Sequence, residues 1–373
     1  MKRIFTLLLA LCLLLSGCGG LGGATDVPGT AAPATESTAA PTTEPTVEPT
    51  RSPTTVPTEP PVLYRHPLTG ETLEAPYTGR PTAVVINNLK KCLPQHGISQ
   101  ASMIYEVETE GGITRLLAIF SDVSQVAEIG PVRSLRTFFT SIAASYDVPT
   151  VHCGGSVKGL RGMHSISAKL KDWEHVDEQY NGEFFYRDQA RKQQGYAREH
   201  TLFTTGELLT QALVKKELNT VYETPQDYGL QFSDAVALAG ESANTVKVTF
   251  TGKKTTSFTY DPETGLYKAS QYKKDHIDGS TGEVMTYRNL IVLHSGLKKE
   301  HDGYYTRSYY NLIGDGKGYF ICNGQMVHIL WSRKTVNDPF VYTLEDGTPL
   351  TLGVGKSYVA IVGLKSPAGV ECE

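Results

Sequence analysis

Apolar and polar positions follow two different periods in the part of the chain after residue 80. Short apolar runs rich in branched residues predict buried strands at 82–87, 103–108 and 115–121. The segment 134–147 instead has helical spacing, with Ser134 as its expected N-cap, and 206–218 repeats that spacing. Because strands and helices alternate here, we expect an α/β domain with a mixed sheet at residues 63–228.

Beyond residue 228 the apolar runs become short and alternate with polar positions. Gly or Asp residues interrupt them at intervals that are typical of antiparallel hairpins. This pattern occupies residues 245–252, 288–296, 317–324, 326–333, 339–347 and 357–363. It predicts a second, mainly antiparallel β domain at residues 229–373, so that the folded part of the chain is α/β or α+β as a whole.

The N-terminal residues predict an export signal followed by a tether. Two cations precede an apolar run from Leu7 to Leu15, which is too short to span a bilayer as a helix, so residues 1–17 are assigned to a signal peptide. Residues 18–62 consist mostly of Thr, Pro, Ala, Gly and Glu. Such a segment cannot bury an apolar face and recover its ordering entropy, so we expect it to be disordered.

The tetrapeptide Leu15-Ser16-Gly17-Cys18 resembles the lipobox of bacterial lipoproteins, in which the Cys is acylated and becomes the new N-terminus. The resemblance implies that Cys18 carries an acyl group such as palmitate. It also implies a location on the extracytoplasmic face of a bacterial cell membrane, with the lipid bilayer as a partner. An ordinary secretory signal with an incidental Cys is the alternative.

Charge and cysteine content argue against nucleic-acid binding and against a metal site. The formal charge of the whole chain is −4 and becomes more negative when Lys2 and Arg3 leave with the signal peptide, so no nucleic-acid partner is expected. There is no C-x-x-C pair, and neither a metal site nor a cofactor is predicted. The four Cys after Cys18 are expected to be free and mostly buried, and a Cys322–Cys372 disulfide is the first alternative.

The stretch "EIGPVRSLRTFF", residues 128–139, places Arg133 and Arg136 near the start of the predicted helix. The first-turn amides and the dipole of a helix favour an anion at that end. Arg115, at the start of a neighbouring strand, would add a third guanidinium group with forked donors. The alternative is that these arginines pair with nearby acids and lock the sheet edge to the helix. The acids that could do so are Glu106, Glu108, Glu110 and Glu128.

The stretch "HCGGS" at residues 152–156 brings a His and a Cys next to a Gly pair. Adjacent residues of a strand point to opposite faces, so His152 and Cys153 are not expected to form a catalytic pair. Gly154 and Gly155 are expected to turn the backbone or to let a ligand approach it closely.

Several segments, including "RPTAVVINN", "PQHGISQASMIYEVETEGGITRLLAIF", "IGPVRSLRTFF" and "YDVPTVHCGGS", resemble successive signature blocks of the YerB-like bacterial lipoproteins. The resemblance covers nearly all of residues 65–373 and implies an exported lipoprotein with two domains, but no reaction. By position, the blocks nominate one surface that includes the predicted ligand-binding residues Asn87, Asn88, Glu110, Thr114, Arg115, Arg133, Arg136, His152, Gly154 and Gly155.

Three functions fit these observations. The leading hypothesis is a membrane-anchored binding or assembly factor that recognises an anionic ligand of the cell envelope through Arg115, Arg133 and Arg136. The ligand would be a polyprenyl phosphate, a teichoic-acid-like phosphate or a carboxylated glycan. The second hypothesis is an envelope enzyme that transfers or hydrolyses a phosphoryl or glycosyl-phosphate group, with Glu106 or Glu110 as base or metal ligand. The third is a scaffold whose β domain docks a partner protein.

Overall fold

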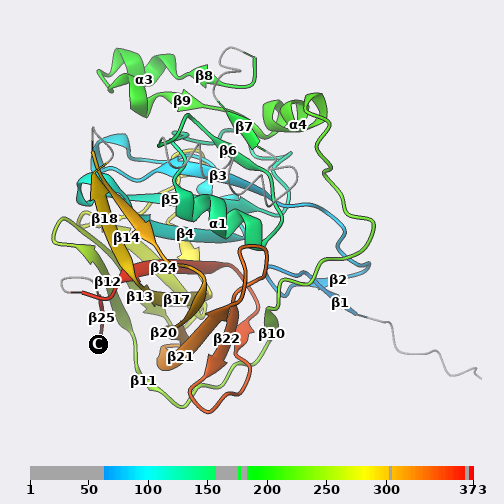
Figure 1. Cartoon of the computed structure of the whole chain (residues 1–373), viewed down its shortest axis with the longest axis vertical. Helices are drawn as coiled ribbons and strands as arrows, with labels where there is room; N and C mark the ends of the chain where they lie inside the picture. The colour runs from blue at the N-terminus through cyan, green and yellow to red at the C-terminus, as the bar shows by residue number, and fades with distance from the viewer. Residues whose placement is uncertain (1–62, 157–174, 178–182, 302–304, 366–368) are drawn as a thin grey trace, which may run out of the picture. The chain divides into compact units, whose positions relative to one another are not determined.

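The computed structural model describes residues 63–156, 175–177, 183–301, 305–365 and 369–373 (Figure 1). The predicted signal peptide, the tether and Cys18 lie outside these residues. No helix in the described ranges is both long enough and apolar enough to cross a membrane. The α-helices described are α1 (Thr137–Ser145), α3 (Gln189–Gln193) and α4 (Gly206–Lys215).

One mixed sheet of eleven strands runs through the folded part of the chain. Its order is β11-β21-β20-β17-β24-β4-β5-β3-β6-β7, and β22 also pairs with β21. The strands from the first half of the chain are β3 (Thr82–Asn87), β4 (Met103–Glu108), β5 (Thr114–Phe120), β6 (Thr150–His152) and β7 (His175–Asp177). Those from the second half are β11 (Glu241–Ser242), β17 (Asn289–Ser295), β20 (Gly314–Cys322), β21 (Gln325–Arg333), β22 (Val341–Leu344) and β24 (Ser357–Gly363).

The two halves of the chain meet between β24 and β4, which pair in parallel from Ser357↔Met103 to Ile361↔Val107. On its other edge β24 pairs in parallel with β17. Both segments predicted as domains therefore contribute strands to the same sheet. The predicted fold class is confirmed: the structure is mixed α/β with strands predominating, and most strand pairs of the second half are antiparallel.

A second sheet of six antiparallel strands covers one face of the central sheet. Its strands are β12 (Thr245–Thr251), β13 (Lys254–Asp261), β14 (Leu266–Gln271), β15 (Lys274–Asp275), β16 (Thr286–Tyr287) and β25 (Gly369–Cys372). Burial alternates along β12, because Val246, Val248 and Phe250 face the central sheet while the residues between them are less buried. This alternation is the pattern that predicted antiparallel structure here.

Successive residues of β4 and β5 enter two different cores. Ile104 and Leu116 pack with the second sheet, whereas Tyr105 and Leu117 pack with Phe139 of α1 on the opposite face. The central sheet is thus buried on both sides, which explains why its inner strands appear in the sequence as continuous apolar runs. Side-chain parity along β4 and β5 also decides where each candidate site residue lies.

Helix α1 begins later than predicted. The sequence predicts Ser134 as N-cap, but Arg136 occupies that position, and no side chain caps the helix. The backbone before the helix is paired instead with the segment after β6: Cys153 N donates to Arg133 O (3.0 Å), and Leu135 N donates to Gly154 O (3.0 Å). This pairing keeps the residues around Ser134 extended. Helix α4 begins where predicted, with Thr205 Oγ1 accepting from Leu208 N at 3.1 Å.

Small two-stranded sheets and helical turns complete the fold. The two-stranded elements are β1 (Tyr64–Arg65) with β2 (Thr72–Leu73), β8 (Tyr186–Arg187) with β9 (Leu202–Phe203), β10 (Gln231–Ser233) with β23 (Thr351–Gly353), and β18 (Leu297–His301) with β19 (Thr306–Tyr310). The 3-10 turns are η1 (Lys90–Cys92), η2 (Ile98–Gln100), η3 (Glu110–Gly112) and η5 (Arg198–His200).

All four cysteines in the described ranges are free thiols. Cys322 lies in the core on the α1 side of the central sheet, and Cys372 packs against the core on the other side. The sheet separates the two sulfur atoms, so the alternative of a Cys322–Cys372 disulfide is not realised. Burial raises the pKa of the Cys372 thiol to about 11 and that of the Cys92 thiol to about 12.

Candidate functional site

Glu110 lies at the centre of a cluster of guanidinium groups. It belongs to η3, the tight connection between β4 and β5, where Gly111 and Gly112 adopt φ values of 75° and 74° that favour glycine. Glu110 Oε2 accepts from Arg136 Nε at 2.9 Å, and Oε1 lies 3.0 Å from Arg115 Nη2. The same Oε1 also contacts Arg136 Nη2 and lies 3.0 Å from Nη1 of Arg307.

Arg115 and Arg136 also hold the backbone that precedes α1. Arg115 Nη1 donates to Ser134 O at 2.7 Å, and Arg136 Nη1 donates to Leu135 O at 2.6 Å. The two residues are only 2% and 5% exposed. For these two arginines the structure shows the alternative in which arginines pair with a nearby acid. Glu110 is that acid, and the three side chains together connect the sheet edge to the helix.

Positive charge is in excess in this cluster. Burial lowers the pKa of Arg136, and repulsion from Arg307 and Arg133 lowers it further. The half-buried Arg133 makes no side-chain hydrogen bond or ion pair with any residue that the structure describes, and its Nε is buried without a partner. We call Glu110 with Arg115, Arg133, Arg136 and Arg307 the arginine cluster. It sets the guanidinium groups of Arg115, Arg133 and Arg136 against the one carboxylate of Glu110, which Arg307 also contacts.

The segment after β6 adjoins the arginine cluster through its backbone. Gly155 forms a bridge with Leu135, and at Gly154, with φ +61°, no atom of the described residues lies near the position of a Cβ. These glycines therefore lie close to the backbone of Arg133. His152 is fully buried, and its Nδ1 lies 2.9 Å from Gly154 O, so its imidazole does not reach the surface.

Asn88 and Thr114 lie on the opposite face of the central sheet from Arg115. Both donate to Glu106 Oε1, at 2.9 and 2.5 Å respectively. The same oxygen lies 3.2 Å from Nζ of Lys254, whose side chain is 1% exposed. The predicted single surface is thus wrong, because Thr114 and Arg115 are neighbours on a strand and must point to opposite sides.

The network around Glu106 is closed and joins the two sheets. Glu106 Oε2 accepts from Thr256 Oγ1 at 2.9 Å and from Tyr358 Oη at 2.7 Å. Its partners come from β13 and β24, and sequence reasoning did not nominate them. The sequence does contain a signal for Lys254, because Lys254, Thr256 and Phe258 occupy alternate positions of β13 and are all buried. Asn87, at the end of β3, contributes to a different contact: its Nδ2 lies 2.9 Å from His200 Nδ1.

Neither acid that was nominated as a base is suited to take up a proton. Burial alone would raise the pKa of Glu110, but the charges of Arg115 and Arg136 outweigh it and hold the pKa well below its ordinary value. Burial opposes ionisation of Glu106 as well, yet Lys254 and the hydrogen bonds from Thr114 and Tyr358 keep its pKa low. In the described part of the chain, no group of three or more His, Cys, Asp or Glu side chains is arranged to hold a metal ion.

Comparisons with known proteins identify relatives of the whole folded part. The family model described as "Protein of unknown function (DUF3048) N-terminal domain" matches residues 68–219, and the corresponding C-terminal domain model matches residues 246–359. A relative from Bacillus subtilis (strain 168), named "Putative lipoprotein YerB", is 31% identical over 311 residues, which cover 79% of this chain and 88% of the relative. The crystal structure of YerB protein from Bacillus subtilis matches with a TM-score of 0.70 and 27% identity, covering 83% of this chain and 99% of that chain.

Proposed function

The chain belongs to the YerB-like family with DUF3048 domains, and we propose that it is a lipid-anchored envelope protein that binds an anionic ligand at the arginine cluster. The anchor would be an acyl group on Cys18, within a stretch that resembles a lipobox. The name of the Bacillus subtilis relative supports this assignment. Incorporation of labelled palmitate that persists in a Cys18→Ser variant would contradict it.

The charge imbalance of the arginine cluster carries the proposal. The guanidinium groups of Arg115, Arg133 and Arg136 exceed the one carboxylate of Glu110 by two positive charges, in a place where Arg115 and Arg136 are nearly inaccessible to water. Like charges in a partly buried site repel each other more strongly than in water. An anion beside Arg133, whose guanidinium has no partner among the described residues, would offset this repulsion.

The surrounding backbone favours the same kind of ligand. Helix α1 begins directly after Arg136 without a side-chain cap, so the positive end of its dipole lies next to Arg136. Among the described residues, no atom lies near the position that a Cβ would take at Gly154, whose carbonyl accepts from Leu135 N. A phosphate or carboxylate group fits these features, whether it is part of a polyprenyl phosphate, a teichoic-acid-like polymer or a carboxylated glycan.

Arg133→Ala tests this proposal without disturbing the two arginines that hold the fold. The probes are vesicles with and without polyprenyl phosphate, poly(glycerol phosphate) and polygalacturonate, each titrated against residues 60–373. We expect the affinity for at least one anionic probe to fall about 10- to 100-fold, which corresponds to the loss of a charge-assisted hydrogen bond of about 1.5–3 kcal/mol.

Arg198→Ala is the matched control, because Arg198 is exposed and lies outside the cluster. It removes the same charge from the surface and should leave the affinity nearly unchanged. Equal affinities for the two variants would refute the proposal, since they would show that only overall charge matters.

The rival functions receive less support. An enzyme of the second hypothesis would need an acid beside the guanidinium groups, and Glu110 is in that position. However, both oxygens of Glu110 pair with arginines and its pKa is low, so it is not suited to act as a base. For a docking surface, the exposed large hydrophobic residues between 300 and 345 are Tyr305 and Val341 in the part of the chain described. Two isolated side chains do not make an apolar patch of the size that marks an interface.

A further inference from the structure

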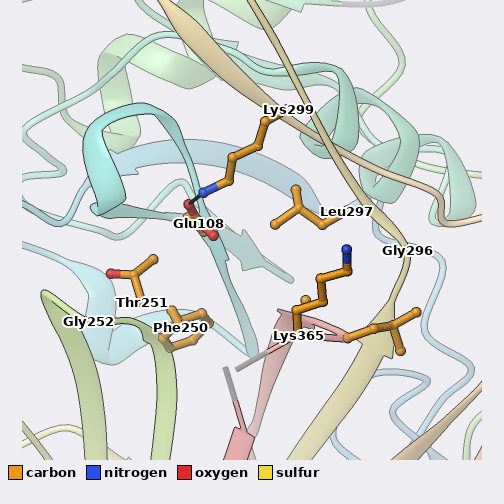
Figure 2. A pocket seen from close by; sticks show the side chains of 10 residues that line it. Glu108, Phe250, Thr251, Gly252, Gly296, Leu297, Lys299 and Lys365 are labelled. Atoms are coloured by element: carbon orange, nitrogen blue, oxygen red, sulfur yellow. Dashed lines mark hydrogen bonds and ion pairs between the residues drawn. The ribbon is translucent and has the colours of Figure 1, made fainter. Parts of the chain in front are cut away.

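A cavity of about 590 Å³ lies where the ends of several strands meet, separate from the arginine cluster residues. Its walls come from the end of β12, the β17–β18 junction and the end of β24, and Glu108 at the end of β4 also lines it (Figure 2). Both parts of the family fold thus contribute to the cavity. Its volume is within the range of about 300–1,000 Å³ that is common for small-molecule sites.

One side of this cavity is charged. Glu108 is nearly inaccessible, and its Oε1 accepts from Lys299 Nζ at 2.7 Å, so that the charge of Lys299 is already compensated. The amino group of Lys365 points into the same space (Figure 2). Lys365 has no hydrogen bond or ion pair with the residues that the structure describes. The cavity therefore holds one acid and two cations, with an excess of one positive charge.

The remaining wall is apolar. Phe250, Leu297 and Leu364 line it, and Leu364 is 68% exposed. An exposed Leu at the wall of a cavity loses its contact with water when an apolar group enters, which is favourable. Thr251 does not offer its hydroxyl freely, because its Oγ1 donates to Gly112 O at 2.7 Å. The site thus combines a single uncompensated ammonium group with an apolar surface.

We infer that this cavity binds an anionic amphiphile with one charged head group. A carboxylate or phosphate head would lie at Lys365, and an alkyl chain would pack along Phe250, Leu297 and Leu364. A free inorganic anion would leave the apolar wall uncovered, and a neutral alkyl chain would leave Lys365 without a counter-ion. This inference concerns a second site and does not depend on the ligand of the arginine cluster.

The test uses residues 60–373, which form one compact unit, and calorimetric titration below the micelle-forming concentration of each probe. The probes are dodecanoate, dodecyl phosphate, dodecanol and inorganic phosphate. We expect both alkyl anions to bind and the other two probes to bind at least about tenfold more weakly, because each lacks one of the two recognised features. Dodecanoate and dodecyl phosphate distinguish a carboxylate from a phosphate head.

Two exposed side chains provide variants that should fold normally. Lys365→Gln should weaken the alkyl anions about tenfold and leave dodecanol unchanged, and Leu364→Asn should weaken all alkyl probes. Lys298→Gln is the control, because Lys298 precedes Lys299 on β18, pairs with Glu300 and is 75% exposed. It should change nothing.

Each other outcome overturns the inference. Equal binding of dodecanol and dodecyl phosphate would show that charge is not recognised, and equal binding of inorganic phosphate would show that the apolar wall is not used. Failure of every probe to bind would leave no amphiphile site. If Arg133→Ala abolished alkyl-anion binding while Lys365→Gln had no effect, the ligand would belong to the arginine cluster instead.

Discussion

Replacing Glu110 by Gln tests whether one carboxylate holds the arginine cluster together. The change keeps the size of the side chain and one acceptor oxygen, and it removes the negative charge. The side chains of Arg115, Arg136 and Arg307 are 3%, 6% and 12% exposed, so water cannot replace the lost carboxylate. Arg115 and Arg136 would then lose the carboxylate that pairs with them.

The expected cost follows from this burial. Removing one partner of a buried ion pair typically destabilises a protein by about 3–5 kcal/mol, because the surviving charge is left uncompensated. Here more than one guanidinium loses its partner, while the hydrogen bonds to Ser134 O and Leu135 O remain. We therefore expect a loss of about 4–5 kcal/mol, a large part of the stability of about 5–15 kcal/mol that is usual for a domain.

Urea unfolding of residues 60–373 at pH 7, followed by circular dichroism, measures this loss. The control is Asp234→Asn, which removes a carboxylate from an exposed pair with Arg65, where the side chains are 41% and 72% accessible. Such surface pairs contribute little to stability. The reasoning would be refuted if Glu110→Gln changed the free energy of unfolding no more than Asp234→Asn.

Acid pH and added anions give two further readings of the same variant. The folded-state pKa of Glu110 is lowered from 4.5, so its ionised form stabilises the fold above pH 4.5, and this stability is lost as the pH falls towards the folded-state pKa. Glu110→Gln lacks that acid-dependent loss. If an anion binds at the arginine cluster, inorganic phosphate should restore part of the stability of Glu110→Gln and none of that of Asp234→Asn.

Two other buried groups can be tested by the same assay. Lys254→Met should lower the free energy of unfolding by about 3–5 kcal/mol, because it leaves Glu106 charged and unpaired. Adding Glu106→Leu to the same chain should recover much of this loss. A double-mutant cycle that shows no coupling between the two positions would contradict the ion pair. Burial and the charge of Lys254 lower the pKa of His276 from 6.5 to about 4. Because the unfolded state takes up the proton first, the free energy of unfolding should decline by up to about 3 kcal/mol as the pH falls from 6.5 to about 4. An unchanged pH profile in His276→Gln would exclude His276 as the cause.

Most strands of the central sheet could be predicted, because burial on both faces produces unbroken apolar runs. The predicted strands 82–87, 103–108 and 357–363 agree with β3, β4 and β24 residue for residue. The pairing of β24 with β4 could not be predicted, since the two strands lie far apart in the sequence and an apolar run does not specify its neighbour. The continuity of the sheet between the two halves therefore does not follow from the sequence pattern.

Only the part of the arginine cluster that is close in sequence can be predicted, because long-range neighbours are not visible in the sequence pattern. Arg115 and Arg136 are close in sequence to Glu110, and short connections bring them together. Arg307 comes from a distant hairpin, and only its ion pair with Glu110 reveals that it belongs to the cluster. The predicted start of α1 is too early because Ser134 is a good N-cap by residue type, while pairing with the segment after β6 competes for the same backbone.

The stretch "EVETE" at residues 106–110 contains a signal for the partner of β4. Three acids at alternate positions at the end of a buried strand require cations, and each receives one from the second half of the chain. The ion pairs are Glu106–Lys254, Glu108–Lys299 and Glu110–Arg307, with N–O distances of 3.2, 2.7 and 3.0 Å. Charge complementarity thus selects the second half as the partner of β4.

The first half of the chain should therefore not fold alone. Without residues 229–373, Glu106 and Glu108 would lose the cations that compensate them, and β4 would lose β24 as its neighbour in the sheet. Burying β4 would then require burying unpaired carboxylates, which is too costly for a domain of ordinary stability. We expect residues 60–228 to show no cooperative transition in urea, whereas residues 60–373 unfold in one. A cooperative transition of the shorter fragment at pH 7 would show that β4 does not depend on these cations.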